Sequence, residues 1–283
     1  MITHTLSSLQ AQGLERLDAQ RLVLHALGRA DHDRAWLLTH DSETLPADAQ
    51  TRLDALVLRY LSGEPMGYLL GHQAFYRLDL QVDARVLVPR PDTEPLVDWA
   101  LEVLAPYTVA AVIDLGTGSG AIALALKATL PRLQVIAVDA SADALAVALA
   151  NAQRLSLAVD FVQTSWLSGV VGPFDVIVSN PPYIADQDHH LAALTHEPLS
   201  ALASGRDGLD AIRSIVTQSV SRLKLGGWLL LEHGYDQAPA VLALLSDAGF
   251  TQIQSRQDLA GMARCSGGQW LGTGTSAAPQ TLR

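Results

Sequence analysis

The stretch AAVIDLGTGSGAIALALKATL, residues 110–130, decides the fold class of this 283-residue chain. A short apolar run ends in a loop with three glycines, and a run with helical spacing follows the loop at once. Glycines at such a junction permit a tight turn and let a ligand approach the backbone closely. The pattern therefore predicts a buried strand, a ligand-binding loop and a helix, which together open a parallel sheet.

Downstream of this unit, strand-like and helical runs alternate along the chain. The predicted strands are residues 133–140, 159–163, 174–180, 226–234, 251–258 and 268–274, and the predicted helices are 142–155, 208–223 and 238–250. Alternating units of this kind build a parallel sheet that helices cover on both faces. The sequence therefore predicts an α/β fold class.

The region upstream predicts a separate, helical domain. Apolar residues of TRLDALVLRYL, residues 51–61, recur at helical spacing, and no strand pattern interrupts the chain before about Gly71. Leu78, Leu80 and Val82 then alternate with polar residues, and we expect residues 86–88 to pair with them after a turn. The predicted organisation is a helical domain (1–72), a β-hairpin linker (73–90), an α/β domain (91–275) and a loose tail (276–283).

Composition excludes several classes of protein. Lys and Arg total 19 and Asp and Glu total 29, so the net charge is −10, which argues against a general nucleic-acid binder. The single cysteine, Cys265, excludes an intrachain disulfide and is expected to be a packed residue. The chain shows neither an apolar run of membrane-spanning length nor the pattern of a signal peptide, so we expect a cytoplasmic protein without a membrane partner.

The glycine loop fits two kinds of nucleotide-containing cofactor. Gly116, Gly118 and Ala121 match the dinucleotide spacing G-x-G-x-x-A, and Asp139 ends the next strand, where a carboxylate can accept from ribose hydroxyls. Both features suit a nicotinamide cofactor as well as S-adenosylmethionine. Asp114, two residues before the first glycine, favours S-adenosylmethionine, because a carboxylate there is expected near the cationic end of the cofactor.

A second motif, Asn180-Pro181-Pro182-Tyr183, follows the predicted strand FDVIVSN. The two prolines stiffen the backbone and push the preceding residues towards extended conformations. The Asn180 side-chain oxygen and the Pro181 carbonyl can then accept both hydrogens of a planar NH₂ group, with the Tyr183 ring against its flat face. Such acceptors favour a pyramidal nitrogen and stabilise the transition state of methyl transfer more than the ground state. A purely structural interpretation is a proline-stiffened strand end with a buried asparagine.

The order DLGTGSG, VDA, NPPY resembles class I S-adenosylmethionine-dependent methyltransferases that act on exocyclic or amide nitrogens. Three further stretches, VLVPRPDTEPLVDWAL, SGRDGLDAIR and LLLEHG, resemble the bacterial peptide chain release factor glutamine-N5 methyltransferases, the HemK/PrmC family. The resemblance covers nearly the whole chain. It implies a Rossmann-like domain with a mostly parallel seven-stranded sheet, a small all-helical N-terminal domain and a linking β-hairpin.

The resemblance also implies roles for individual residues. The amino-acid end of S-adenosylmethionine would lie against Gly116, Thr117, Gly118, Ser119 and Gly120, its ribose against Asp139, its adenine against Trp166, and its methyl group near Asn180. Asn180, Pro181, Pro182 and Tyr183 would hold the glutamine of the GGQ motif of class 1 release factors, with help from the helical domain. We expect a monomer that forms no stable complex with nucleic acid.

Several features depart from the family pattern or permit a second interpretation. Ser165 stands where the family usually has an acidic residue, which puts an adenine contact in doubt. Gly267-Gly268-Gln269 is expected to be a turn entering the last strand, not a mimic of the substrate. Pro89-Arg90-Pro91-Asp92-Thr93-Glu94 predicts either a turn with Asp92 or Thr93 as a helix cap, or part of the pocket floor.

The remaining candidates concern metal binding and the class of function. Asp186, Asp188, His189 and His190 are interpreted as a solvated loop, or a lid, in preference to a metal site, and His233 as a packing residue. The first rival function is a nucleic-acid methyltransferase, acting on adenine-N6 or guanine-N2 with the same four residues, Asn180-Pro181-Pro182-Tyr183, which we call the clamp. A nicotinamide-dependent dehydrogenase is the second rival, and a non-catalytic ligand-binding module is the third.

Overall fold

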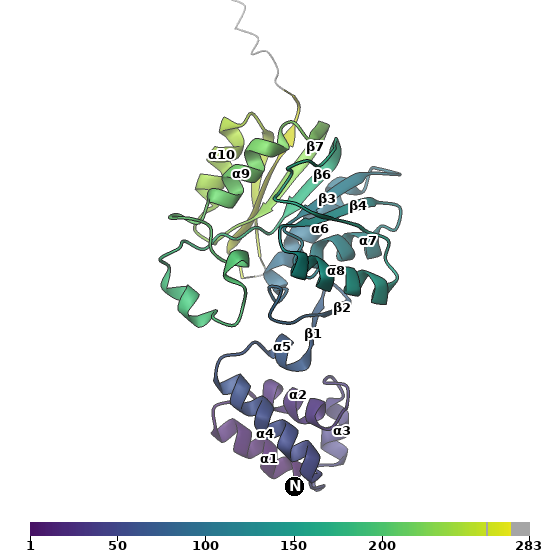
Figure 1. The fold of residues 1–283 in the computed structure, drawn as a ribbon, viewed down its shortest axis with the longest axis vertical. Coiled ribbons are helices and arrows are strands. Elements are labelled where there is room, and N and C mark those ends of the chain that lie inside the picture. Colours follow the sequence, from purple (N-terminus) through teal and green to yellow (C-terminus); the bar gives the residue numbers. More distant parts are fainter. Residues whose placement is uncertain (259, 273–283) are drawn as a thin grey trace, which may run out of the picture. The chain divides into compact units, whose positions relative to one another are not determined.

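The computed structural model describes residues 1–258 and 260–272, and the chain forms two compact units, Met1–His72 and Gln73–Arg283 (Figure 1). The predicted loose tail, 276–283, lies outside the described residues. The first unit is all-helical, with α1 (Ile2–Ala11), α2 (Arg16–Ala26), α3 (Arg34–Thr39), α4 (Ala47–Leu61) and α5 (Met66–Leu70). No helix in the described part of the chain combines the length and apolar character needed to span a bilayer.

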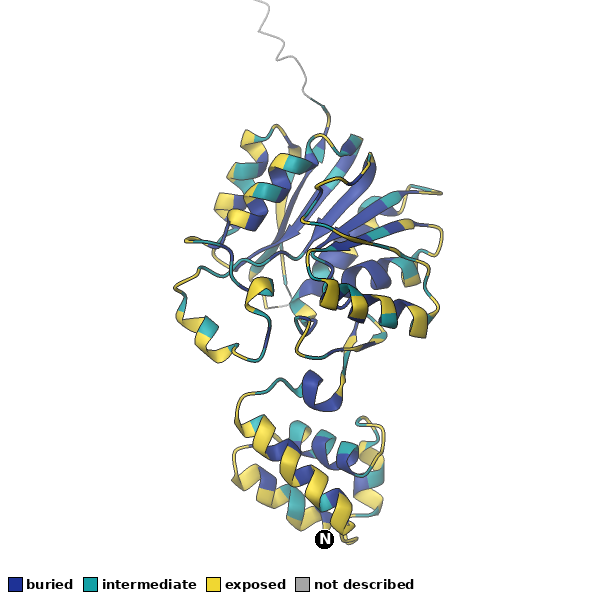
Figure 2. Ribbon diagram, viewed as in Figure 1, coloured by how far each residue is buried: buried dark blue, intermediate teal, exposed yellow. Residues whose placement is uncertain are grey.

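The helical unit is built around one apolar core of its own. The helical spacing in residues 51–61 places Leu53, Leu56 and Val57 on the buried face of α4, where they join Leu22 and Val23 of α2. Figure 2 shows the complementary pattern, with exposed residues along the outer faces of the helices. Burial of the apolar stripe stabilises these short helices more than their intrinsic propensity does.

The β-hairpin differs from its prediction. Leu78 and Leu80 lie in β2 (Leu78–Gln81), as their alternation indicated, but the partner strand is β1 (His72–Phe75). The expected strand at residues 86–88 is wrong, because this segment is irregular and buries both of its valines. Tyr76 and Arg77 make the turn with φ of 44° and 65°. A turn with two positive φ angles usually contains glycine or asparagine, so these residues gave no turn signal.

The second unit contains the seven-stranded sheet, in the order β5-β4-β3-β6-β7-β9-β8. Its strands are β3 (Ala111–Leu115), β4 (Gln134–Asp139), β5 (Asp160–Gln163), β6 (Phe174–Ser179), β7 (Leu223–Glu232), β8 (Thr251–Gln257) and β9 (Ala263–Trp270). The neighbours from β5 to β7 pair in parallel, whereas β9 is antiparallel to both β7 and β8. The predicted α/β fold class with a mostly parallel sheet is confirmed.

Helices cover both faces of this sheet (Figure 1). One face packs on α6 (Glu94–Leu104), α7 (Ala121–Thr129) and α8 (Ala142–Leu155), and the other on α9 (Asp210–Ser219) and α10 (Ala238–Asp247). Successive residues of β3 alternate between the two faces. Val112 belongs to the apolar cluster under α6, α7 and α8, and Ile113 belongs to the cluster under α9 and α10. Both faces of the central strands are therefore buried, which explains why they read as continuous apolar runs.

The internal Gly-Gly-Gln lies within β9 and not in a turn, so that part of the prediction is wrong. A Cβ on Gly267 would lie 2.6 Å from the Leu229 carbonyl oxygen of the neighbouring strand, and a Cβ on Gly268 would lie 3.0 Å from Phe250 Cβ. Gln269 donates from Nε2 to the Gly226 carbonyl. Close packing thus accounts for both glycines, and the glutamine is held within the sheet.

Asn151 connects the hairpin to the glycine loop from the middle of α8. Its fully buried carboxamide accepts from Gln81 N at 2.7 Å and donates to the Gln81 and Ser119 carbonyls, both at 3.0 Å. Asn151→Ala should lower the free energy of unfolding by about 2–3 kcal/mol, because a fully buried side chain is truncated and three backbone groups lose their partner, of which the Ser119 carbonyl is buried and the two of Gln81 are partly buried. Equilibrium urea denaturation measures this, with Gln153→Ala on the exposed side of the same helix as control; a loss below about 0.5 kcal/mol would contradict it.

Candidate active site

The carboxyl ends of β4, β3 and β6 bring three predicted site residues to one edge of the sheet. Leu115, the last residue of β3, is in register with Ser179, the last residue of β6, so Gly116 and Asn180 begin neighbouring loops. Asp139 ends β4 on the other side of β3. The chain order reverses between β3 and β6, and ligands of doubly wound sheets bind at such a reversal.

A cavity of about 230 Å³ opens at this edge, lined by residues of the second unit. The predicted site residues on its wall are Gly116, Thr117, Gly118, Ser119, Asp139, Trp166, Asn180 and Pro182. Among the described residues, Gly120, Pro181 and Tyr183 do not contribute to that wall. Gly120 precedes α7 with φ of 86°, and a Cβ there would lie 2.9 Å from Leu124 Cδ1, so the turn and the packing require glycine.

Asp114, in β3, holds the glycine loop and the start of α7 by hydrogen bonds from within the core. Its Oδ2 accepts from Thr117 Oγ1 at 2.6 Å and from Ala123 N at 3.1 Å, while Oδ1 has no partner among the described residues. The carboxyl group is fully buried, and burial raises its pKa to about 7. That Asp114 lies near the cationic end of the cofactor stays a prediction, since Asp114 itself does not line the cavity but Thr117, which donates to it, does.

Asp139 shapes the loop from the neighbouring strand. Its Oδ2 accepts from Gly118 N, and its Oδ1 accepts from Ser141 N, both at 2.9 Å. Ser141 in turn caps α8 by accepting from Ala144 N. Each carboxylate oxygen has a second lone pair, so Asp139 can still accept hydrogen bonds from a ligand in the cavity.

Trp166 adds a flat apolar surface to the same wall. Its backbone has φ of 51°, and a Cβ built on Gly116 would lie 3.3 Å from its Cζ3 atom. A Cβ built on Gly118, by contrast, would meet no protein atom within 4 Å. The wall thus combines an indole ring, a carboxylate and backbone without side chains, which fits the adenine, ribose and amino-acid parts of S-adenosylmethionine. Ser165, at the usually acidic position, also lines the cavity.

The Asn180 carboxamide is held by one hydrogen bond, in which Nδ2 donates to Thr93 Oγ1 at 3.1 Å. Among the described residues its Oδ1 takes no hydrogen bond, and Asn180 lines the cavity. Thr93 precedes α6 but makes no side-chain capping bond. Of the two interpretations of Pro89-Arg90-Pro91-Asp92-Thr93-Glu94, the structure favours the pocket floor, because Pro89, Arg90 and Thr93 all line the cavity.

Tyr183 is anchored at both its ends. Its carbonyl accepts from Gln237 Nε2 at 2.9 Å, and its hydroxyl donates to Glu232 Oε1 at 3.4 Å. Burial raises the pKa of its phenol above the ordinary value. The ring thus lies behind the cavity wall in this structure, next to Glu232 at the carboxyl end of β7.

Comparison with known proteins decides the family. Curated relatives named release factor glutamine methyltransferase include those of Xylella fastidiosa strain Temecula1 (47% identical over 263 residues, 92% of this chain and 94% of the relative) and Pseudomonas aeruginosa (48% over 259 residues, 90% and 92%). The chain belongs to the release factor glutamine methyltransferase family. This result confirms the family that the sequence resemblance indicated.

Domain-level comparisons agree with this membership. Residues 1–71 match the PrmC N-terminal domain, and residues 97–205 match the methyltransferase small domain. Among solved structures, a methyltransferase from Pyrococcus furiosus is similar with a TM-score of 0.53 at 17% identity, over 80% of this chain and 100% of that one. A 16S rRNA methyltransferase of T. thermophilus, solved with AdoMet and guanosine, has a TM-score of 0.53 at 18% identity, over 70% and 49%. At these identities the two structures support the fold.

The segment that follows Tyr183 is interpreted from the sequence as a solvated loop or a lid. In the structure its later part returns to the cavity. Buried Glu197 accepts from Val88 N at 3.0 Å and forms an ion pair with Arg90. This anchor brings Pro198, Ser200 and Ala201 onto the cavity wall. No local motif marks Glu197, because its partners lie more than a hundred residues earlier in the chain.

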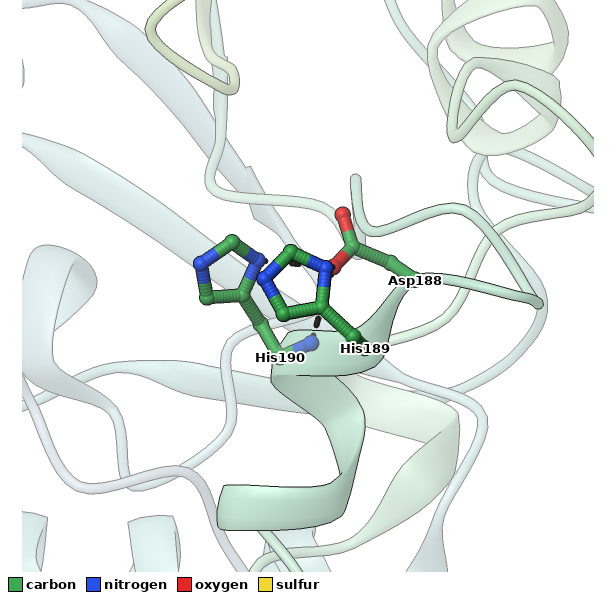
Figure 3. Close-up of side chains that lie close together, drawn as sticks. All are labelled: Asp188, His189 and His190. Atoms are coloured by element: carbon green, nitrogen blue, oxygen red, sulfur yellow. Dashed lines mark hydrogen bonds and ion pairs between the residues drawn. The ribbon is translucent and has the colours of Figure 1, made fainter.

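The aspartate and histidines of the same segment form a small surface cluster (Figure 3). Asp188 precedes the 3₁₀-helix η2 (His189–Ala193), and its Oδ1 accepts from the backbone N of His190 at 2.8 Å and contacts His190 Nδ1 at 2.7 Å. Ligand atoms of Asp188, His189 and His190 lie within 4.8 Å of one another, but both histidines are exposed and Asp186 is not part of the group. A helix cap accounts for this arrangement.

Two other residues singled out in the sequence lie in the sheet. Cys265 is a fully buried free cysteine of β9, and burial raises the pKa of its thiol. His233, just after β7, contacts the Gly234 carbonyl through Nδ1 and Ser266 Oγ through Nε2, both at 2.8 Å. Because the carbonyl can only accept, Nδ1 carries the proton and Nε2 accepts from the hydroxyl. Burial lowers the pKa of His233, which agrees with a neutral packing residue.

Proposed function

We propose that this chain transfers a methyl group from S-adenosylmethionine to the side-chain amide nitrogen of the glutamine in the GGQ motif of class 1 release factors. The observation that supports this most directly is the Asn180 carboxamide, whose Nδ2 is bound to Thr93 and whose Oδ1 is left as an acceptor at a cavity wall. Family membership supports the same substrate, since the curated relatives are named for it.

The residues on the wall suit the parts of the cofactor. Gly116 and Gly118, which line the cavity, would hold its amino-acid end, the Asp139 carboxylate would accept from its ribose, and the Trp166 indole would pack on its adenine. When bound, S-adenosylmethionine supplies an electrophilic methyl group on a positively charged sulfur. The chain's own contribution is to hold the acceptor nitrogen in line with that methyl group and to keep water away from it.

The acceptor nitrogen is a poor nucleophile, because its lone pair is delocalised into the amide carbonyl. Asn180 Oδ1 and the Pro181 carbonyl each accept one of its hydrogens, which favours the pyramidal nitrogen of the transition state over the planar ground state. Pro182 stiffens the backbone between them. Once methylated, the nitrogen becomes acidic and loses a proton to solvent, so no general base needs to act before transfer.

The partner we propose is a protein and not a nucleic acid. The net charge of −10 opposes long-range attraction to a phosphate backbone. The helical unit, residues 1–71, carries the family-specific part of the sequence and is proposed to take part in recognition of the release factor. We propose that the chain acts as a monomer without a membrane partner.

A methyl-transfer assay tests this function. Purified chain is incubated with labelled S-adenosylmethionine and either a wild-type class 1 release factor or one carrying Gln→Glu in its GGQ motif. We expect label on the wild-type factor alone, on the glutamine nitrogen. Label on neither factor would reject the substrate, and label on added DNA or ribosomal RNA would support the nucleic-acid rival instead.

A further inference from the structure

A glutamine side chain joins three loops at the carboxyl edge of the sheet, outside the residues that the proposed chemistry uses. Gln237, which precedes α10, is half-buried, and its Nε2 donates to the Tyr183 carbonyl at 2.9 Å and to the Asp207 carbonyl at 3.3 Å. Its Oε1 accepts from Gly234 N at 2.9 Å. The carboxamide thus uses both its hydrogens and its oxygen, each on the backbone of a different loop.

These partners fix which way the Gln237 carboxamide points. A backbone N–H can only donate and a carbonyl can only accept, so the oxygen lies against Gly234 and the NH₂ group lies against Tyr183 and Asp207. The turn also closes through its backbone, because Gln237 N donates to the Gly234 carbonyl at 3.0 Å. A Cβ on Gly234 would lie 3.1 Å from Gln237 Oε1, so glycine lets this turn close tightly on the carboxamide.

The clamp needs support from outside because its own backbone has few donors. Pro181 and Pro182 carry no N–H group, so neither can be held by a hydrogen bond that it donates. The proline ring fixes φ of Pro182, which leaves ψ of Pro182 and the φ and ψ angles of Tyr183 as the free torsions between the Pro181 and Tyr183 carbonyls. Holding the Tyr183 carbonyl therefore limits where the Pro181 carbonyl can lie.

Other segments of the chain hold the two ends of the clamp. Before the prolines, Asn180 Nδ2 donates to Thr93 Oγ1 at 3.1 Å. Directly after the clamp, Ile184 N donates to the Leu202 carbonyl at 2.9 Å. With both ends held in this way, the hydrogen bond from Gln237 determines the direction of the last carbonyl of the clamp.

We propose that Gln237 is a positioning residue for methyl transfer, whose carboxamide fixes the Tyr183 carbonyl and thereby aims the Pro181 carbonyl at the substrate nitrogen. This inference rests on the proposed function, in which the Pro181 carbonyl accepts one hydrogen of the glutamine NH₂ group. It also gives a role to two stretches of sequence that the chemistry leaves unexplained, because Asp207 belongs to SGRDGLDAIR and Gly234 to LLLEHG.

A misplaced acceptor should slow the chemical step more than it weakens binding. The Pro181 carbonyl stabilises the pyramidal nitrogen of the transition state, and it interacts less strongly with the planar nitrogen of the ground state. An error of about 1 Å in the position of a catalytic group can lower the rate by a factor of about 10². Loss of the Gln237 carboxamide should therefore lower kcat, while KM for the release factor stays near that of wild type.

Gln237→Glu tests the proposal with almost no change of shape. At about pH 8 the new side chain is ionised. One of its oxygens can still accept from Gly234 N, but the other faces the Tyr183 and Asp207 carbonyls, so acceptor meets acceptor. We expect single-turnover methyl transfer to the release factor to slow about 10²-fold, with affinity for S-adenosylmethionine within about twofold of wild type. Gln237→Met, which removes the donors without adding a charge, should slow the reaction about tenfold.

Gln269→Glu is the matched control. Gln269 is also half-buried, its Oε1 accepts from Gln252 Nε2 at 2.8 Å, and its Nε2 donates to the Gly226 carbonyl at 2.9 Å, so the substitution makes the same chemical change. Gly226 lies in the first half of β7, whereas Gln237 follows the carboxyl end of that strand. This control should lose stability in urea and keep the methyl-transfer rate within about threefold of wild type.

The outcomes separate the two proposals. A wild-type enzyme that transfers no methyl group to the release factor would reject the proposed function, and the positioning role would fall with it. If wild type is active and folded Gln237→Glu keeps its rate within about threefold, the function stands and the role of Gln237 is overturned. Equal losses of rate in Gln237→Glu and Gln269→Glu would also overturn it. Circular dichroism shows which variants are folded, and Gln237→Met decides by the same criteria if Gln237→Glu does not fold.

Discussion

Asn180→Ala should keep the fold and lose turnover by a factor of about 10²–10³, or about 2.7–4 kcal/mol of transition-state stabilisation. The expected loss is set equal to that for removal of one oxyanion-hole donor. Asn180 Oδ1 plays the corresponding part as an acceptor, because positive charge develops on the substrate nitrogen and its hydrogens as the methyl group is transferred. The carboxamide makes a single hydrogen bond inside the described part of the protein, to Thr93, so its removal leaves little buried polarity unpaired.

The measurement is a single-turnover methyl transfer at saturating cofactor and release factor, which separates the chemical step from binding. A melting temperature close to that of wild type shows that the loss is not one of stability. Turnover of Asn180→Ala within about threefold of wild type would reject the clamp, because a shift of that size is less than about 1 kcal/mol.

The part of the site that could be predicted from sequence lies where regular strands end. Apolar runs predict buried strands, and parallel strands bring their carboxyl ends to one edge, so the loops at Gly116 and Asn180 were expected to meet. The register of Leu115 with Ser179 places them there. This inference needs only the order of strands and helices, which alternation in the sequence indicates clearly.

The supporting residues could not be predicted in the same way. Thr93 and Asn180 lie 87 residues apart in the chain, and their hydrogen bond depends on how the segment before α6 packs beside the sheet, which no local pattern encodes. Asn151 offered a weak signal, since a carboxamide interrupts the apolar face that Ala144, Val147 and Ala148 define on α8. The hairpin turn offered none, because its positive φ angles fall on Tyr76 and Arg77.

Gly208 is the position where a single added methyl group should have the largest structural effect. Its φ is +75°, and a Cβ there would lie closer than 3.0 Å to both the Tyr183 carbonyl oxygen and Gln237 Nε2. Those two atoms are hydrogen-bonded to each other, at 2.9 Å. The glycine in SGRDGLDAIR is therefore required by the close approach of this loop to the backbone that follows the two prolines.

Gly208→Ala should reduce the free energy of unfolding by about 2–5 kcal/mol, as the sum of a left-handed backbone penalty and overpacking. The enzyme that remains folded should also turn over slowly, because Tyr183 and the clamp before it must shift to admit the methyl group. Gly169→Ala is the matched control, since Gly169 has φ of +71° and no atom within 4 Å of the added Cβ. Equal losses in the two variants, by urea denaturation and by methyl transfer, would mean that backbone strain alone explains Gly208. A larger loss at Gly208 measures the close approach to Tyr183.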